Sequence, residues 1–450
     1  MSARMRKDER APAPASATAG RDVVSFHPSG PLRGSVRVPG DKSITQRALL
    51  IGAVCDGPVE IVEPAWGGDP LATAGMVQAL GVAVDGLAGR ESRAHVHGVG
   101  LHGLRAPGGP LDARNSGTGM RLLAGLLAGQ RGRFVVDGDE SLRRRPMDRI
   151  VAPLRAMGAR ITAREGRYAP LTIEGEPLRA ARHELPVASA QVKSCLLLAG
   201  LLAEGETVIV EPAASRDHTE RLLAAAGAAV TRRGGEIAVR GAERLTLDRV
   251  VVPGDLSSAA FLVAAALLVP GSHLRIENVG LNPTRLGFCE AARRMGGRVV
   301  WNATAGEGGE PRGEIEVRAS ALHGTTIAGS HVPALIDEVT LVALLACHAE
   351  GTTTIEGVSE LRAKESDRLA AIVEIVAALG GMAESRGDAL IVAGRPLRGG
   401  ALSSRGDHRL ALLGAVAGLV CPEGVSVSGF AVADVSFPGF AGLLSEVIGR

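Results

Sequence analysis

Residues 39–50 read Pro39-Gly40-Asp41-Lys42-Ser43-Ile44-Thr45-Gln46-Arg47-Ala48-Leu49-Leu50. A Pro-Gly turn leads into polar residues and then into an apolar run, which predicts a loop entering a helix that Asp41 or Ser43 caps. Ser43 and Arg47 are four residues apart and share one face of that helix. The Lys42 ammonium, the free N–H groups and the positive end of the helix dipole then point to one place. This pattern predicts an anion site, and a capped helix with solvated cations is the alternative.

The same arrangement recurs along the chain. Polar segments open helices that are rich in alanine and leucine and apolar on nearly every side, near Ser43, Gly117, Ala190, Ser257, Glu338 and His408. Helices of this composition are buried. Amphipathic helices alternate with them and end at glycines suited to a C-cap, Gly81, Gly158, Gly227, Gly296, Gly380 and Gly449. Because these glycines are 69 to 84 residues apart, the sequence predicts six similar units.

Six such units, with β-like runs after the helices, predict an α/β fold. A chain of 450 residues exceeds one ordinary core, so two domains of three units are favoured over a solenoid array. If the buried helices run parallel in each domain, their N-termini converge, and two such faces would form a cleft for small multiply charged anions. Residues 1–22 lack periodicity and an apolar segment, which predicts a disordered tail rather than a secretory signal.

The bulk composition disfavours several classes of protein. A net charge of +2 and an aromatic content of 2% disfavour a nucleic-acid surface. The longest apolar runs are shorter than the roughly 20 residues of a membrane span. Five scattered cysteines without a CxxC pair indicate reduced core thiols in a cytoplasmic protein. The histidines show no ligand spacing, so no metal site is predicted.

Lysine is rare in this chain and arginine is common. Only four of the 50 cationic residues are lysines, and Lys42, Lys193 and Lys364 each lie in a polar motif, where a compact ammonium of adjustable pKa is favoured. Three arginines at 143–145 precede a proline. They form either a solvated loop or a site for bidentate capture of carboxylate or phosphate.

Two acidic segments and one histidine are further candidates. Asp337 precedes the fifth buried helix as a cap or as a proton acceptor. Glu365 and Arg368 lie in the densest charge cluster, which is either functional or the salt-bridged start of a surface helix. His408 is a catalytic candidate, although a capped histidine is commoner. Segments 215–220 and 253–258 are interpreted as helix caps.

Taken together and in order, these motifs resemble one enzyme family. They are PGDKSITQRALL, NSGTGMRLL, SLRRRPMDR, SAQVKS, SRDHTE, PGDLSSAAF, NPTR, IDE, ELRAKESDR and GDHR. From about residue 25 to 450 the chain is similar to the 5-enolpyruvylshikimate-3-phosphate synthase family. The resemblance implies two inverse α/β domains, each of three βαβαββ repeats. Residues 39–252 would form the N-terminal domain, and 23–38 with 253–450 the C-terminal domain, which includes the first strand.

The resemblance also implies the activity, an enolpyruvyl transfer in the shikimate pathway of aromatic amino-acid biosynthesis. The enolpyruvyl group of phosphoenolpyruvate would pass to the 5-hydroxyl of shikimate 3-phosphate, with release of phosphate and without a cofactor. The domains would close over the two substrates. We expect a cytoplasmic monomer without nucleic-acid or membrane partners.

The resemblance assigns roles to residues of this chain. Shikimate 3-phosphate would contact Lys42, Ser43, Arg47, Ser189, Ala190, Gln191, Arg216, Asp337 and Lys364. Phosphoenolpyruvate would contact Lys42, Asn115, Gly117, Thr118, Arg145, Gln191, Arg368 and Arg409. The catalytic residues would be Asp337, which accepts the hydroxyl proton, Glu365, which moves the proton at the methylene, and Lys42, which lies between the substrates.

Some positions depart from the family pattern. Val435 stands where many members have lysine, which puts one phosphoenolpyruvate contact in doubt. Thr340 stands where related members often have proline, and Thr45-Gln46 stands where Ser-His or Ser-Asn is more usual. Gly117 has no methyl group to narrow the pocket, so we expect sensitivity to glyphosate, a compact anion.

Two other functions are alternatives to this one. The sister transferase acting on UDP-N-acetylglucosamine carries a cysteine five residues before its Arg-Pro, where this chain has Glu140. A non-catalytic phospholigand-binding protein is the other alternative. The presence of both Asp337 and Glu365 argues against it, because a binding protein needs no acid–base pair.

Overall fold

Six buried helices organise the computed structural model, which describes residues 22–87, 90–304 and 306–448. They are α1 (Lys42–Ala53), α3 (Gly117–Ala128), α6 (Ala190–Gly200), α8 (Leu256–Leu268), α10 (Val339–Cys347) and α12 (His408–Gly418). Every residue of α10 is buried, as expected for a helix that is apolar on all sides. The predicted series of buried helices is therefore confirmed.

Amphipathic helices alternate with the buried ones. They are α2 (Gly68–Ala79), α5 (Asp148–Ala156), α7 (His218–Ala225), α9 (Gly287–Arg294), α11 (Arg368–Ala378) and α13 (Phe440–Ile448). The glycines after the first five have positive φ angles, from 85° at Gly227 to 98° at Gly158, which suits a C-cap. The sixth predicted cap, Gly449, lies outside the described residues, as do residues 1–21 of the predicted tail.

Short helices complete the connections. They are α4 (Glu140–Arg143) and the 3₁₀ segments η1 (Pro283–Arg285), η2 (Glu307–Gly309), η3 (Gly329–Ala334), η4 (Ser359–Ala363) and η5 (Phe430–Val435). Among the described residues, every helix is too short or too polar to cross a bilayer. All five cysteines are buried and unpaired, which confirms the prediction of core thiols.

The second unit shows the repeat in full. Its strands are β6 (Leu111–Asp112), β7 (Arg133–Asp137), β8 (Arg160–Arg164) and β9 (Tyr168–Glu174). Helix α3 joins β6 to the parallel strand β7, and α5 leads on to the antiparallel pair β8 and β9. The sheet order is β6-β7-β9-β8. The unit is thus βαβαββ, as the resemblance implied.

Two further units have the same order. In the third they are β11 (Arg182–Glu184), β13 (Glu206–Val210), β14 (Val230–Arg233) and β15 (Glu236–Arg240), beside a short pair, β10 (Leu178–Arg179) and β12 (Ala203–Glu204). In the fifth they are β20 (Thr326–Ile327), β21 (Thr352–Ile355), β22 (Met382–Arg386) and β23 (Ala389–Ala393). Both sheets run in the order first, second, fourth, third strand.

The remaining units take strands from distant parts of the chain. The first sheet holds β3 (Asp56–Val62), β4 (Ala83–Asp85), β5 (Arg93–Val99) and β16 (Arg249–Val251). The fourth holds β2 (Arg33–Arg37), β17 (His273–Gly280), β18 (Arg298–Thr304) and β19 (Arg312–Arg318). The sixth holds β1 (Val23–Phe26), β24 (Gly400–Ser403) and β25 (Val425–Ser428). Strands β16 and β2 pair in parallel with β3 and β17, and β1 pairs antiparallel with β25.

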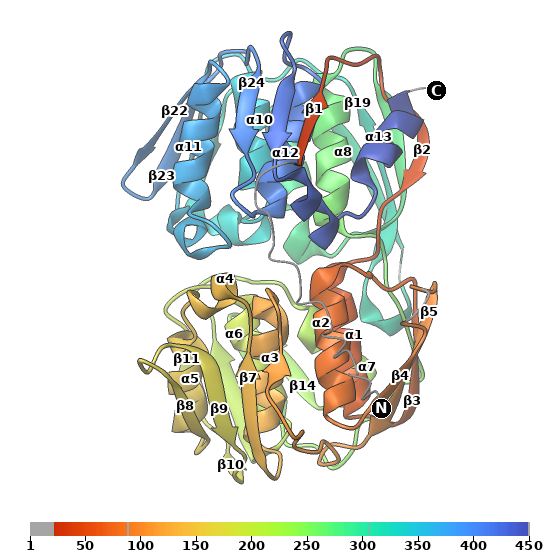
Figure 1. Ribbon diagram of the computed structural model, residues 1–450, viewed down its shortest axis with the longest axis vertical. Helices are drawn as coiled ribbons and strands as arrows, with labels where there is room; N and C mark the ends of the chain where they lie inside the picture. Colours follow the sequence, from red (N-terminus) through yellow and green to blue (C-terminus); the bar gives the residue numbers. More distant parts are fainter. Residues whose placement is uncertain (1–21, 88–89, 305, 449–450) are drawn as a thin grey trace, which may run out of the picture.

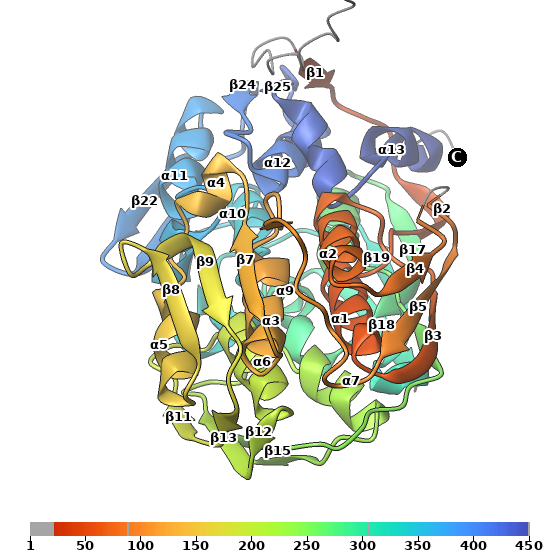
Figure 2. The ribbon, with the colours of Figure 1, turned by 60° about the horizontal axis from the view of Figure 1, so that its bottom comes forward.

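Buried hydrophobic side chains form two separate cores, seen as two lobes in Figure 1. The first lobe has its core between Ile44 and Val252. The second lobe combines Phe26 to Val38 with Leu256 to Val447. Helices α1, α3 and α6 lie side by side in the first lobe (Figures 1 and 2). We propose that the predicted domain limits, at residues 39 and 252, separate two folding units.

The described chain crosses between the lobes at two adjacent places. The Asp41 N–H donates to the Pro253 carbonyl, and the Asp255 N–H donates to the Pro39 carbonyl, both at 2.8 Å. Gly40 and Gly254 form an antiparallel bridge between the crossings. A Cβ atom on Gly40 would lie 2.3 Å from the Glu63 carbonyl oxygen, so only glycine fits there. The two crossings therefore form one narrow connection.

Candidate active site

A cavity of about 370 Å³ lies between the lobes. All six buried helices bring residues at or just before their N-terminal ends to its wall. These residues are Ser43, Thr118, Gln191, Ser257, Asp337 and Arg409. The convergence expected from the polar motifs is therefore present. Since each N-terminus carries partial positive charge and free N–H groups, this wall favours anions.

The charged side chains of the wall reinforce this preference. Nine are cationic, namely Lys42, Arg121, Arg145, Arg149, Arg216, Arg285, Lys364, Arg368 and Arg409. Five are acidic, namely Asp69, Asp255, Asp337, Glu360 and Glu365. The excess of cations in the cavity exceeds the net charge of +2 on the whole chain. The positive charge of the protein is thus concentrated where an anionic ligand would bind.

N-caps made by side chains explain why most of these helices begin where they do. The side chains of Asp41, Ser116, Ser189, Asp255 and Asp407 each accept a hydrogen bond from a backbone N–H in the first turn. For α1 the cap is Asp41 rather than Ser43, whose side chain lines the cavity. Glu338 precedes α10 without capping it. Its carboxylate accepts from Ser257 Oγ and lies 3.4 Å from Arg409 Nη1.

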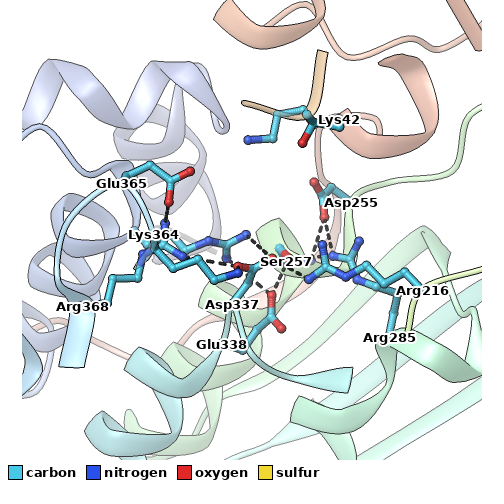
Figure 3. Close-up of polar contacts among 12 residues, drawn as sticks. Lys42, Arg216, Asp255, Ser257, Arg285, Asp337, Glu338, Lys364, Glu365 and Arg368 are labelled. Atoms are coloured by element: carbon cyan, nitrogen blue, oxygen red, sulfur yellow. Dashed lines mark hydrogen bonds and ion pairs between the residues drawn. The ribbon is translucent and has the colours of Figure 1, made fainter. Parts of the chain in front are cut away.

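Asp337 lies among four cations from both lobes, three of which, Arg216, Lys364 and Arg368, are labelled in Figure 3. Its carboxylate is 2.5 Å from Arg216 Nη2 and 3.3 Å from Lys364 Nζ. Arg368 and Arg409 approach it at 3.3 and 3.6 Å. Burial alone would raise the pKa of Asp337, but these cations hold it well below its ordinary value. The carboxylate is therefore ionised at neutral pH.

Glu365 lies on the other side of Arg368. Its carboxylate is 2.6 Å from Arg368 Nη2 and 3.5 Å from Arg145 Nη1, a residue of the first lobe. Burial opposes ionisation of Glu365, but Arg368 and Arg145 lead the charges that hold its pKa well below the ordinary value. Arg368 begins α11 and is 1% exposed, so the alternative of a salt-bridged surface helix is wrong for Arg368, whereas Arg362 and Asp367 do form an exposed ion pair.

Polar contacts position the residues of the first lobe. Lys42 Nζ lies 3.0 Å from Asp69 at the start of α2. Gln191 donates to Thr118 Oγ1 at 2.8 Å and accepts from Arg121 Nη1 at 2.5 Å. The amide of Gln191 is therefore held between α3 and α6, with a defined direction.

Two predicted contact residues, Arg47 and Asn115, do not line the cavity. Arg47 is buried behind Ser43 and donates to the Ser43 carbonyl, Ser194 Oγ and Thr219 Oγ1. Asn115 accepts from Arg145 Nη2 at 2.6 Å. Both reach the cavity through a neighbour, since Arg47 supports the α1 terminus and Asn115 orients the Arg145 guanidinium.

The other predicted site residues line one wall. They are Lys42, Ser43, Gly117, Thr118, Arg145, Ser189, Ala190, Gln191, Arg216, Asp337, Lys364, Glu365, Arg368 and Arg409. His408 lines it as well, and its Nε2 has no hydrogen-bond partner among the described residues. Burial and the nearby Lys42 lower the pKa of His408 to about 3, so the ring is neutral.

Three motifs have roles that differ from their interpretation in the sequence. Asp217 stands at the α7 N-cap without a side-chain capping bond and instead binds Arg221 and Asn282. Asp255 caps α8 as predicted, but it also lines the cavity. Lys193 is fully buried between Glu211 and Glu220, away from the cavity wall. Its ammonium supports the fold of the first lobe.

Several lining residues were not predicted, namely Asp69, Arg121, Arg149, Arg285 and Glu360. Arg121 follows Gly117 by one helical turn, so helical spacing could have placed it on the same face. Arg149 and Glu360 form a bidentate ion pair between the lobes, at 2.8 and 3.0 Å. Nothing in the sequence indicates a pairing over 211 positions. No group of three or more residues suited to holding a metal occurs among the described residues.

Solved structures with this architecture define the class. EPSP synthase from Acinetobacter baumannii is 38% identical and has a TM-score of 0.84, with 94% of this chain and 98% of that chain covered. The enolpyruvyl transferase NikO from Streptomyces tendae, at 19% identity and a TM-score of 0.76, covers 94% and 97% and shares the fold. The two-lobed fold is thus that of the enolpyruvyl transferases.

Sequence relatives identify the family within this class. The family described as EPSP synthase (3-phosphoshikimate 1-carboxyvinyltransferase) matches residues 26–444. The 3-phosphoshikimate 1-carboxyvinyltransferase of Thermus thermophilus is 49% identical over 93% of this chain and 97% of its own. That of Alkalilimnicola ehrlichii is 46% identical over 94% and 95%. The chain belongs to the EPSP synthase family and is a transferase.

Proposed function

We propose that this chain transfers the enolpyruvyl group of phosphoenolpyruvate to the 5-hydroxyl of shikimate 3-phosphate and releases phosphate. The reaction belongs to the shikimate pathway of aromatic amino-acid biosynthesis. One observation carries the proposal. Asp337 and Glu365 lie in one cavity among cations of both lobes, where helix N-termini converge. Such a site can neutralise two phosphates and a carboxylate and still supply acid–base groups.

Each substrate would take its own part of the wall. Shikimate 3-phosphate would bind Lys42, Ser43, Ser189, Ala190, Gln191, Arg216, Asp337 and Lys364, with Arg47 supporting Ser43. Phosphoenolpyruvate would bind Lys42, Gly117, Thr118, Gln191, Arg145, Arg368 and Arg409, with Asn115 orienting Arg145. Lys42 would lie between the substrates and neutralise charge on both. No cofactor is part of this proposal.

The chemistry would proceed by addition and elimination. Asp337 accepts the proton of the 5-hydroxyl, and the 5-oxygen of shikimate 3-phosphate bonds to C2 of phosphoenolpyruvate. Glu365 delivers a proton to the methylene carbon. In the tetrahedral intermediate, the C2–phosphate bond then breaks. Glu365 recovers a proton from the new methyl group, and phosphate leaves with the hydroxyl proton, which Asp337 gives up.

Substrate charge would tune both acids. In the empty cavity the surrounding cations favour the ionised form of each. When phosphates and a carboxylate pair with the same cations, the pKa of Asp337 and that of Glu365 rise. Asp337 then becomes a stronger base, and Glu365 can carry a proton. Closure of the lobes would keep water from the intermediate.

Two features of the whole chain belong to the proposal. We expect a cytoplasmic location, which five buried, unpaired thiols support. We expect a monomer without nucleic-acid or membrane partners. The large hydrophobic side chains exposed among the described residues, Val23, Val99, Val300 and Met382, lie on four different strands.

Glyphosate should occupy the phosphoenolpyruvate part of the cavity. A Cβ atom on Gly117 would lie 3.0 Å from Arg121 Nη1 and 3.1 Å from Arg145 Nη1, so glycine leaves room beside these guanidinium groups. We expect inhibition that competes with phosphoenolpyruvate. Steady-state assays at millimolar glyphosate test this, and uninhibited turnover would contradict it.

A phosphate-release assay tests the proposed function. Release should require phosphoenolpyruvate and shikimate 3-phosphate together, and neither alone should suffice. Replacing shikimate 3-phosphate by UDP-N-acetylglucosamine should give no release, since Glu140 stands at the position of the cysteine in that family. Release with the nucleotide sugar only would assign the sister activity. Binding of both substrates without release of phosphate would indicate a non-catalytic phospholigand-binding protein.

A further inference from the structure

Arg285 lies where the chain crosses between the lobes (Figure 3). It ends η1 and is 3% exposed. Its Nη1 is 3.3 Å from Asp41 Oδ2, and its Nη2 is 3.3 Å from Asp255 Oδ1. Nη2 also donates to Ser257 Oγ at 2.6 Å. One guanidinium group therefore bridges both crossing segments.

The two carboxylates that Arg285 joins are helix caps. Asp41 Oδ1 accepts from the Ile44 N–H at the start of α1, in the first lobe. Asp255 Oδ1 accepts from the Ser257 N–H at the start of α8, in the second lobe. Because Lys42 and Ser43 follow Asp41 directly, the fork of Arg285 ties the part of α1 that reaches the cavity to the second lobe.

The contacts continue from the crossing into the cavity. Ser257 Oγ donates to Glu338, whose carboxylate lies 3.4 Å from Arg409 Nη1. Arg409 in turn lies 3.6 Å from Asp337. A continuous series of polar contacts thus runs from the crossing to groups at the start of α10 and α12.

Charge makes Arg285 hard to replace. Burial and the neighbouring Asp255 raise the pKa of Asp41, whereas Arg285 lowers it. Two buried carboxylates this close to each other repel unless a cation lies between them. A lysine could supply the charge, but a single ammonium lacks the planar fork that reaches both carboxylates.

We propose that Arg285 is a positioning residue that holds Lys42 and Ser43 of the first lobe in register with Asp337 and Arg409 of the second. Arg285 lines the cavity, but Asp41, Asp255 and Ser257 engage its guanidinium group, so we assign its effect on the reaction to the residues that it positions. This role rests on the proposed function. It predicts a selective defect in the use of phosphoenolpyruvate, whose proposed contacts come from both lobes. Most proposed contacts of shikimate 3-phosphate lie on the first lobe.

The test compares Arg285→Gln and Arg285→Lys with Arg275→Gln, which removes an exposed arginine of β17 that pairs with Glu314. Calorimetry measures the Kd for shikimate 3-phosphate, and steady-state kinetics measure the KM for phosphoenolpyruvate. For Arg285→Gln we expect a Kd within about threefold of the unaltered protein and a KM at least about tenfold higher. Arg285→Lys should recover only part of this loss. Arg275→Gln should change neither constant.

If Arg285→Gln does not fold, a second variant still tests the proposal. Asp41→Asn keeps a side-chain oxygen that can cap α1, but it removes the carboxylate that Arg285 holds. It should show the same selective rise in KM, which loss of active protein alone would not produce. The proposal would be overturned if the Kd and the KM of both Arg285→Gln and Asp41→Asn lay within threefold of the values for the unaltered protein. An equal rise in the Kd and the KM would overturn it as well. If the proposed function itself fails, the unaltered protein will release no phosphate.

Discussion

At the scale of single residues, the cavity holds each acid by the cations that a substrate would later engage. Asp337 contacts arginines of both lobes, and Glu365 shares Arg368 with it. An acid with these partners is fixed in direction and ionised before any ligand binds. The same partners are natural ligands for phosphate. Binding and acid–base chemistry are therefore coupled through shared cations.

Removal of either acid should separate binding from turnover. Asp337→Asn and Glu365→Gln should each reduce kcat by about two to four orders of magnitude, because each removes one proton-transfer group. Shikimate 3-phosphate should still bind measurably, since most of its cationic and hydroxyl contacts remain. Phosphate release and calorimetry check the two expectations. Glu384→Gln, on the exposed strand β22, is the matched control. Turnover unchanged in both acid variants would refute the assignment.

The ionised Asp337 should also stabilise the fold in a pH-dependent way. Burial opposes its ionisation, but Lys364 and Arg216 lead the cations that hold its pKa well below 3.8 in the folded chain. A depressed pKa stabilises the fold above the unfolded value, and this stabilisation is lost as the pH falls through the folded value. The difference in unfolding free energy between the unaltered chain and Asp337→Asn should therefore shrink below about pH 4.

Urea unfolding at about pH 7, 5 and 3 measures this difference. The difference in unfolding free energy should shrink at low pH because a protonated aspartate and an asparagine are both neutral. Once Asp337 is protonated, the surrounding cations stabilise the unaltered chain no more than they stabilise Asp337→Asn. A difference that stays constant or grows toward pH 3 would contradict it.

The sequence predicted most of the residues that line the cavity, but it did not predict the contacts of some of them. Gly117, Arg145 and Asp337 lie in motifs whose type and order are informative, and they line the cavity. Arg47 has the same helical face as Ser43, yet Ser194 and Thr219 hold it behind the wall. Those partners are 147 and 172 positions away in the chain. A local pattern cannot show which distant side chain will compete for a guanidinium group.

At the scale of elements, close helix packing sets the wall of the first lobe. Helices α3 and α6 meet where a Cβ atom on Gly125 would lie 2.1 Å from the Cys195 carbonyl oxygen. Glycine lets the two backbones approach, and these helices carry Thr118 and Gln191 at their N-terminal ends. The direction of the Gln191 amide therefore depends on this contact.

Gly125→Ala should force α3 and α6 apart. We expect a loss of about 1–3 kcal/mol in unfolding free energy, since a methyl group has no space there. Gly75→Ala in α2 is the matched control, because open space surrounds its Cβ position. That change should be neutral or stabilise the chain by up to about 1 kcal/mol through higher helix propensity. Denaturant unfolding measures both, and equal effects would contradict the packing argument.

The elements themselves were predictable to different degrees. All-round apolarity predicted the buried helices, because burial on every side leaves no polar face. The glycine C-caps predicted where five amphipathic helices end. Strand pairing was harder to predict. Glu60 pairs with Arg249, and Arg37 pairs with Glu277, so the register depends on contacts between remote parts of the chain.

At the scale of the whole molecule, the described residues form two lobes that are joined by a narrow connection and enclose a cavity between them. The wall is incomplete in either lobe alone, since the Asp337 and Glu365 carboxylates lie in the second lobe and their partners Arg216 and Arg145 lie in the first. The number of units could be inferred from repeated motifs, and the domain limits at residues 39 and 252 stay a prediction. Which faces meet could be inferred only as a hypothesis, because the crossing at Gly40 and Gly254 depends on backbone contacts that no motif encodes.

The most direct test of this account is a crystal structure of the chain with shikimate 3-phosphate and phosphate, one substrate and one product of the proposed reaction. We predict that both anions lie in the cavity between the lobes. Together they should contact the N-terminal ends of α1, α3 and α6 and the guanidinium groups of Arg368 and Arg409. Ligands seated outside the cavity, or contacts from one lobe only, would contradict the claim that helix termini of both lobes form a single anion site.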